Sequence, residues 1–307
     1  MKTIWNLLKQ TVTEWNEDQA TVLAAALAYY TIFALAPTLI IVVAVAGLVF
    51  GQGTAQEALL EEVTAAVGSD VAGVLRTLLE NTSQSGSGVL ATVIGVALLI
   101  FGATGLFAQL QNALNRVWGV KPNPSAGVMN ILRTRVLSLG MVLVIGFLLL
   151  VSLLLSAALS VVSNYFSDLL FLPGEETFWQ FMNFALSTAV ITLLFAMIFK
   201  YLPDVKVTWR DVWVGALVTS LLFSLGKFLI SYYIGSSSVS STDGAAGSLV
   251  VLLLWIYYSA QILLFGAEFT QVYGRRFGSG IQPAEYAVRS DAAPANKFSS
   301  EAPNEEG

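Results

Sequence analysis

The sequence contains no cysteine and no histidine, and charged residues occupy only 11% of its 307 positions. Without cysteine the chain has no disulfide and no thiol chemistry. Without histidine it has no Ser-His-Asp triad and lacks a common ligand of zinc. A glycine-rich phosphate loop followed by Lys-Ser or Lys-Thr is also absent. We therefore predict no catalytic residues, no metal site and no cofactor, and we expect a protein that is not an enzyme.

Hydrophobic residues, in contrast, make up 56% of the chain, and the mean hydropathy is +0.72. So few polar residues cannot cover a water-soluble globule of this size. The apolar runs are long and continuous, which favours helices over the short alternating strands of a barrel. We predict an all-α, polytopic membrane protein with six transmembrane helices, at residues 24–50, 89–109, 136–162, 181–199, 212–234 and 248–272.

The basic residues predict the orientation of these helices. Of the 15 lysines and arginines, 13 lie in segments on one side of the predicted membrane, and the opposite side has Arg76 alone. Because Lys and Arg are retained on the cytoplasmic side, both termini should be cytoplasmic. The cations form no continuous groove, so we expect membrane lipids as partners and no nucleic acid.

Three segments flank or connect the spans. Residues 1–23 have apolar side chains at helical spacing and predict an amphipathic helix, which would lie on the inner interface or pack on the protein. Residues 54–80 predict a short helical hairpin outside, either capping an external opening or packing on helix ends. The tail, 279–307, is rich in Ala, Pro, Ser and Glu and predicts disorder. Residues 24–278 would then form one transmembrane domain.

Lys227 lies within the fifth predicted span, where an ammonium ion is costly unless it faces a cavity, a counter-charge or a cargo. Ser220, Ser224 and Ser231 lie on the same helical face. We predict that this face contacts a substrate, together with Tyr257 and Gln261 of the sixth span. The alternative is that Lys227 extends its side chain outward to the headgroups.

A second polar group is predicted at the cytoplasmic end of the bundle. Gln109, Asn112 and Arg116 share one face of the second helix, and Glu268 lies near the end of the sixth. We expect these four residues to form a network that holds helices together. Glu268 should lie too far along the membrane normal to meet Lys227.

The first predicted helix contains Pro37, which removes a backbone donor and predicts a kink. Pro37 and Gly47 together mark a predicted hinge.

Three segments carry a resemblance to a known family. They are AAALAYYTIFALAPTLIIVVAVAGLVFG (24–51), QLQNALNRVWGV (109–120) and GAAGSLVVLLLWIYYSAQILLFGAEFTQVYGRRFG (244–278). They resemble the YihY/BrkB family of bacterial inner-membrane proteins, which implies a six-helix, multi-pass protein of the cytoplasmic (inner) membrane. Some members have carried the name ribonuclease BN. The absence of His and Cys and the scarcity of cytoplasmic acids disfavour ribonuclease activity here.

The resemblance, taken with Lys227, favours a transporter or flippase-like exporter of an amphiphilic or anionic envelope component. Two alternatives stay open. One is a non-transporting scaffold of envelope machinery, in which the polar stripes hold helices together. The other is a membrane enzyme that acts on lipid.

Overall fold

The computed structural model describes residues 2–67, 105–123, 175–236, 245–278 and 280–290, with single helical positions between 72 and 80 and between 136 and 151. Residues 105–117 form a helix. The labelled helices are α1 (Lys2–Glu17), α2 (Ala20–Phe50), α3 (Gln52–Val67), α7 (Glu175–Tyr201), α8 (Trp209–Ser236) and α9 (Ala245–Phe277). Four short strands accompany them: β1 (Val120–Pro122), β2 (Val205–Lys206), β3 (Gln282–Pro283) and β4 (Ala287–Arg289).

The fold is mostly helical, as predicted, although the four strands depart from an all-α fold. Within the described residues, three stretches are long and apolar enough to cross a membrane, namely Phe181–Tyr201, Trp209–Leu229 and Leu252–Phe277. The bent pair α1 and α2 would make a fourth. Most of the predicted spans 89–109 and 136–162 lies outside the described residues, so the count of six stays a prediction.

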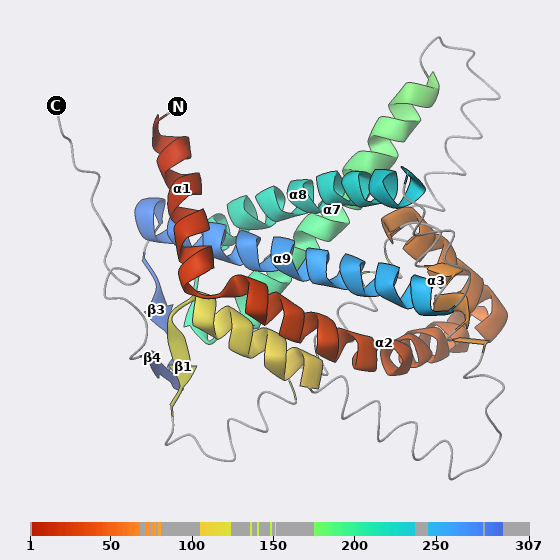
Figure 1. The fold of residues 1–307 in the computed structure, drawn as a ribbon, viewed down its shortest axis with the longest axis horizontal. Coiled ribbons are helices and arrows are strands. Elements are labelled where there is room, and N and C mark those ends of the chain that lie inside the picture. Colours follow the sequence, from red (N-terminus) through yellow and green to blue (C-terminus); the bar gives the residue numbers. More distant parts are fainter. Residues whose placement is uncertain are drawn as a thin grey trace.

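Helix α9 is the central element of the described bundle. It contacts α8, α2 and α1, and α7 packs on α8 (Figure 1). Of the residues in the apolar part of its candidate span, 44% are buried, compared with 22% in that of α7 and 33% in that of α8. Polar side chains on α9 are therefore the ones most enclosed by protein.

Helices α8 and α9 approach each other closely through two reciprocal threonine–glycine contacts. A Cβ added at Gly266 of α9 would lie 1.9 Å from Oγ1 of Thr219 in α8, and one added at Gly215 of α8 would lie 1.7 Å from Oγ1 of Thr270 in α9. Each threonine thus occupies the space that a larger residue would need. Small residues permit such close helix packing in membranes, so we treat α8 and α9 as one rigid unit.

The N-terminal segment turns sharply before α2. The axes of α1 and α2 differ by 64°, and Gln19 between them has a left-handed backbone with φ 53°. One face of α1 is buried, with Leu7 and Thr11 at 6% and 0% exposure, while its opposite face exposes the apolar residues Ile4, Trp5, Leu8 and Val12. The helix therefore packs on the protein, as one of the two alternatives expected.

Helix α2 begins at Ala20 rather than at residue 24 and is helical through Pro37 and Gly47. The bend that the structure shows precedes α2. The hinge at Pro37 and Gly47 stays a prediction.

The predicted hairpin corresponds to α3 and the helical positions 72–73, 75–77 and 79–80. Its apolar side chains pack in one buried cluster with residues of α2 and of the first half of α9. The cluster contains Ala28, Leu59, Leu60, Leu75, Leu79, Leu252, Trp255 and Ile256. A cleft of about 280 Å³ lies between the hairpin's two arms, lined by Glu57, Glu61 and Arg76 among others. The hairpin therefore packs on helix ends.

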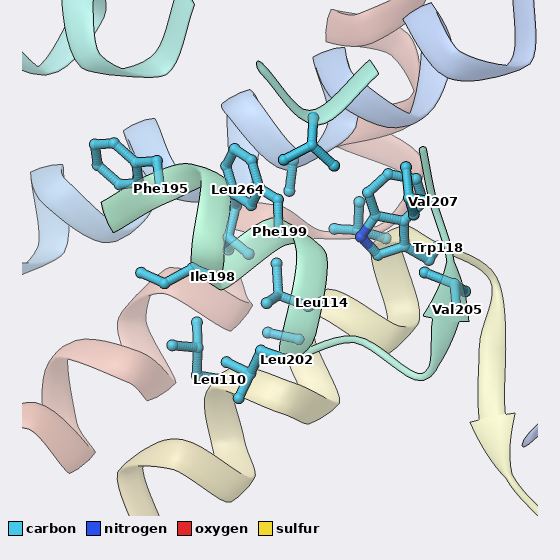
Figure 2. Close-up of a cluster of buried hydrophobic side chains, with 14 of the residues drawn as sticks. Leu110, Leu114, Trp118, Phe195, Ile198, Phe199, Leu202, Val205, Val207 and Leu264 are labelled. Carbon is cyan, nitrogen blue, oxygen red and sulfur yellow. The ribbon is translucent and has the colours of Figure 1, made fainter. Parts of the chain in front are cut away.

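At the opposite end of the bundle lies the larger hydrophobic cluster (Figure 2). Leu110 and Leu114 lie on the helix at 105–117, and Trp118 comes directly after it. Phe199 lies in the last turn of α7, and Leu202 comes directly after that helix. Leu264 brings α9 into the same cluster. This end also carries most of the described cations, so we call it the basic end. Its members include Arg116, Lys121, Lys200, Lys206, Arg210, Arg275 and Arg276.

The chain beyond α9 is ordered at the basic end, which corrects the prediction of disorder from residue 279. Strand β3 pairs antiparallel with β2, and β4 pairs antiparallel with β1. Ile281, Ala284 and Ala287 are buried. We call residues 280–290 the clasp. Composition alone predicted disorder because it cannot show that β3 and β4 form hydrogen bonds with strands of two distant loops. Residues 291–307 lie outside the described part.

Candidate functional site

Polar residues follow one face of α9 along most of its length. Tyr257, Gln261, Glu268, Gln271 and Arg275 are spaced 4, 7, 3 and 4 apart, which places them on the same side of the helix. We call these five residues the polar stripe. At 1.5 Å per residue the stripe extends about 27 Å, close to the roughly 30 Å of a bilayer core. Tyr257 and Gln261 were predicted to contact a substrate and Glu268 to join a network at the cytoplasmic end, and all of them lie on this one face of α9.

The stripe is deeply buried at its basic end. Glu268 and Gln271 are 0% exposed and Arg275 is 5% exposed, while Tyr257 and Gln261 are half-buried. Neither amide atom of Gln271 has a hydrogen-bond partner among the described residues, and the same holds for Oε1 of Gln261. A buried amide without a partner costs about 1–3 kcal/mol, and such groups are rare in native proteins. Among the described residues, the stripe therefore contains hydrogen-bonding capacity that no other group uses.

A buried ion pair joins the stripe to the N-terminal helix. Nη2 of Arg275 contacts Oε1 of Glu14 in α1, and both side chains are 5% exposed. Gln10 donates a further hydrogen bond of 3.1 Å to the same oxygen. The second oxygen, Oε2 of Glu14, is buried without a hydrogen-bond partner in the described part of the chain. Breaking a buried ion pair is strongly destabilising, so this pair holds α1 against α9.

A second buried acid, Asp204, joins three segments at the basic end. Its carboxylate accepts hydrogen bonds from Nε2 of Gln111 at 3.0 Å and from Nδ2 of Asn115 at 2.8 Å. Its backbone N–H donates to Oδ1 of Asn115 at 2.8 Å, and its carbonyl accepts from the N–H of Ala284 in the clasp. The turn after α7 is thereby fixed to the helix at 105–117 and to the clasp.

The polar network predicted at this end used the wrong face of the helix at 105–117. Asn112 and Arg116 are exposed, and Arg116 reaches Gln19 at 3.4 Å rather than the core. The structure buries Gln111 and Asn115 instead. Of the predicted network members, Gln109 is half-buried and Glu268 is fully buried on α9. The apolar pattern of Leu110, Leu114 and Val117 marks the buried face and would have selected the correct amides.

The serine stripe of α8 mainly serves helix packing in this structure. The hydroxyls of Ser220 and Thr192 in α7 lie 2.7 Å apart, and Ser220 is fully buried. Ser224 donates to the carbonyl of Ser220 at 2.9 Å. These bonds show a packing role for Ser220, and its contact with a substrate stays a prediction. Lys227 is half-buried, and its contact with a substrate stays a prediction. The side chain of Ser231 lies outside the described part.

No three acidic side chains gather closely enough to hold a metal ion in the part of the chain that the structure describes. The buried acids Glu14, Asp204 and Asp211 accept hydrogen bonds from protein donors. The described site thus offers hydrogen-bond donors, acceptors and charges.

The comparisons with known proteins agree with a membrane bundle of this kind. A sequence model described as Virulence factor BrkB matches residues 11–290, which include α2, α9 and the clasp. The chain belongs to the BrkB family. The resemblance noted in three segments is thereby confirmed over almost the whole described chain.

Several relatives in this family carry the name UPF0761 membrane protein. The one from Alcanivorax borkumensis is 29% identical over 264 residues, which cover 84% of this chain and 58% of that protein. The one from Verminephrobacter eiseniae is 29% identical, covering 87% of this chain and 62% of that protein. The one from Photobacterium profundum is 28% identical, covering 95% of this chain and 90% of that protein. The chain thus spans less than two thirds of the first two relatives. No solved structure gives a significant match.

The family and the apolar helices together show a membrane protein. The names of the relatives state no reaction, substrate or partner. Any activity must accordingly be inferred from the polar stripe and its surroundings.

Proposed function

We propose that this member of the BrkB family is a transporter or flippase-like exporter in the bacterial cytoplasmic membrane. Its cargo would be an amphiphilic or anionic envelope component. The observation that carries the proposal is the polar stripe on α9, whose buried amides lack hydrogen-bond partners among the described residues. Polar side chains in a membrane core face cavities or partners and mark transport routes.

The position of the stripe suits a route across the membrane. It lies on the most enclosed helix and extends about 27 Å along it, with Arg275 at the basic end. Arg275 and the amide of Gln271 at the basic end would attract an anionic headgroup and offer it hydrogen bonds. The amide of Gln261 would offer further hydrogen bonds beyond the acidic residue Glu268. The proposed orientation places the basic end on the cytoplasmic side.

The packing suggests which parts would move. Helices α8 and α9 are interlocked by Thr219 and Thr270, and Ser220 fastens α7 to α8. The N-terminal unit, α1 and α2, is held to α9 at the basic end by the pair of Glu14 and Arg275. We propose that this unit moves against the block of α7, α8 and α9, and that the ion pair closes the stripe in the present conformation.

The scaffold remains the second candidate because specific contacts favour it. The hydroxyl pair of Ser220 and Thr192 and the clamp around Asp204 are polar groups whose bonds hold helices and loops together. The unused amide of Gln271 distinguishes the two candidates, since a scaffold has no need for it.

Reconstitution into vesicles tests the proposal. Purified protein is inserted into vesicles with fluorescently labelled phosphatidylglycerol or phosphatidylethanolamine, and dithionite quenching reports lipid that reaches the outer leaflet. We expect movement above that of protein-free vesicles, loss of movement in Gln271→Leu, and retention in Gln282→Ala, which alters an exposed strand residue. Equal rates with and without protein for both lipids would count against transport of lipid-like cargo.

A further inference from the structure

The turn between α7 and α8 carries an exposed aromatic surface at the basic end. Tyr201 ends one candidate span and Trp209 begins the next. Tyr201, Trp209 and Trp213 are 46%, 41% and 44% exposed. The ring centroids of Tyr201 and Trp209 lie 5.9 Å apart, and those of Trp209 and Trp213 lie 6.3 Å apart. Tyr and Trp at span ends are typical of the headgroup level of a bilayer.

Two cations accompany these rings. Nζ of Lys200 donates to the carbonyl of Val207 and lies 5.8 Å from the ring centroid of Trp209. Arg210 is exposed in the first turn of α8. The nearby acid, Asp211, is buried and faces α9, where its carboxylate adjoins Gly278. No described carboxylate neutralises Arg210 in an ion pair, whereas Lys206 on the adjoining strand lies 3.1 Å from Glu285.

An apolar strip continues from these cations along the outside of α8. Leu217, Leu221, Leu225 and Phe228 are exposed, and their spacing from Arg210 places them on its helical face. The surface therefore offers cationic donors at headgroup level and an adjoining apolar strip that fits an acyl chain.

We propose that this surface, consisting of Lys200, Tyr201, Trp209, Arg210 and Trp213, is a binding site for an anionic phospholipid. The guanidinium of Arg210 and the ammonium of Lys200 hold the phosphate. The indole rings border the headgroup, and the strip on α8 takes the chain. The site lies on the outside of α7 and α8, so it does not depend on the proposed transport.

Native mass spectrometry of the full-length protein in detergent tests this site. Phosphatidylglycerol or phosphatidylcholine is titrated into the sample, and the apparent affinity of the first bound lipid is compared. We expect tighter binding of phosphatidylglycerol to the unaltered protein. A basic residue near a lipid surface contributes about 1 kcal/mol, so Arg210→Gln should weaken binding of phosphatidylglycerol about fivefold. Arg210→Lys should retain most of it.

The matched control is Lys206→Gln, which removes the same charge from the same end at a residue that already pairs with Glu285. It should leave the affinity unchanged. Equal weakening by Arg210→Gln and Lys206→Gln would show a general charge attraction and overturn the site. Equal binding of the two lipids by the unaltered protein would overturn it as well. Lipid exchange in vesicles should persist in Arg210→Gln, which separates failure of this site from failure of transport.

Discussion

Replacing Gln271 by leucine should make the protein more stable. The amide is 0% exposed, and neither of its polar atoms has a hydrogen-bond partner among the described residues. Leucine has a similar volume and no polar atoms. A buried group left without a partner costs about 1–3 kcal/mol. The different shape of leucine will cost some packing energy. We therefore expect a net gain of about 1–2 kcal/mol in the free energy of unfolding.

The same substitution at Gln111 supplies a matched control of opposite sign. Gln111 is also buried, but its amide donates a 3.0 Å hydrogen bond to the carboxylate of Asp204. Gln111→Leu removes a donor from a buried charge, so it should cost about 1.5–3 kcal/mol. Both variants remove one amide and add one leucine. If the free energy of unfolding rises in one variant and falls in the other, the difference must come from the hydrogen bonding of the two amides and not from the added apolar surface.

The assay is reversible unfolding in mixed micelles, followed by far-ultraviolet circular dichroism, with the denaturing detergent varied. Both variants are compared with the unaltered protein at equal concentration. A loss of stability in Gln271→Leu as large as that in Gln111→Leu would refute the reasoning. It would mean that the amide of Gln271 is bonded in the folded protein and serves as helix glue, as the scaffold alternative requires.

Three further perturbations have expected outcomes. Glu14→Gln should cost about 3 kcal/mol because it removes the charge that Glu14 contributes to a buried ion pair. The double variant with Arg275→Met should recover most of this loss in the same unfolding assay, and no recovery would contradict the pairing. Gly266→Ala should destabilise by about 1–3 kcal/mol because the added Cβ would meet Thr219, whereas Gly53→Ala, with open space around it, should not. Truncation after residue 279 should speed proteolysis at the loop strands β1 and β2, and truncation after residue 290 should not; equal rates would remove the clasp from the account.

Much of the fold follows from the sequence because lipid allows few solutions. A run of apolar residues must form a helix to satisfy its backbone, so the boundaries of α7, α8 and α9 were predicted to within about six residues. The family was predicted from residues 24–51, 109–120 and 244–278, which include most of α2 and all of α9. The hairpin was also predicted, because the spacing of Leu59, Leu60, Leu75 and Leu79 identifies its buried face.

The candidate site was harder to predict because it depends on contacts between distant segments. The pairing of Glu14 with Arg275 joins residues 261 apart in the chain, and helical spacing within one segment cannot reveal it. The choice of Asn112 and Arg116 over Gln111 and Asn115 had another cause, since the polar spacing alone was used and the apolar pattern of the same helix was not. The clasp was missed because its strands are too short to show alternation. Ser220 was assigned to a substrate before its neighbour Thr192 was known.

The most direct test of the central claim is whether water reaches the polar stripe. The chain has no native cysteine, so any thiol signal arises from an introduced residue. Gln261→Cys and Gln271→Cys are compared in sealed membranes with Leu254→Cys, an exposed position on the outside of α9, using a charged, membrane-impermeant thiosulfonate applied from each side. The account predicts modification at both stripe positions and none at Leu254→Cys. Stripe positions as unreactive as Leu254→Cys from both sides would contradict it.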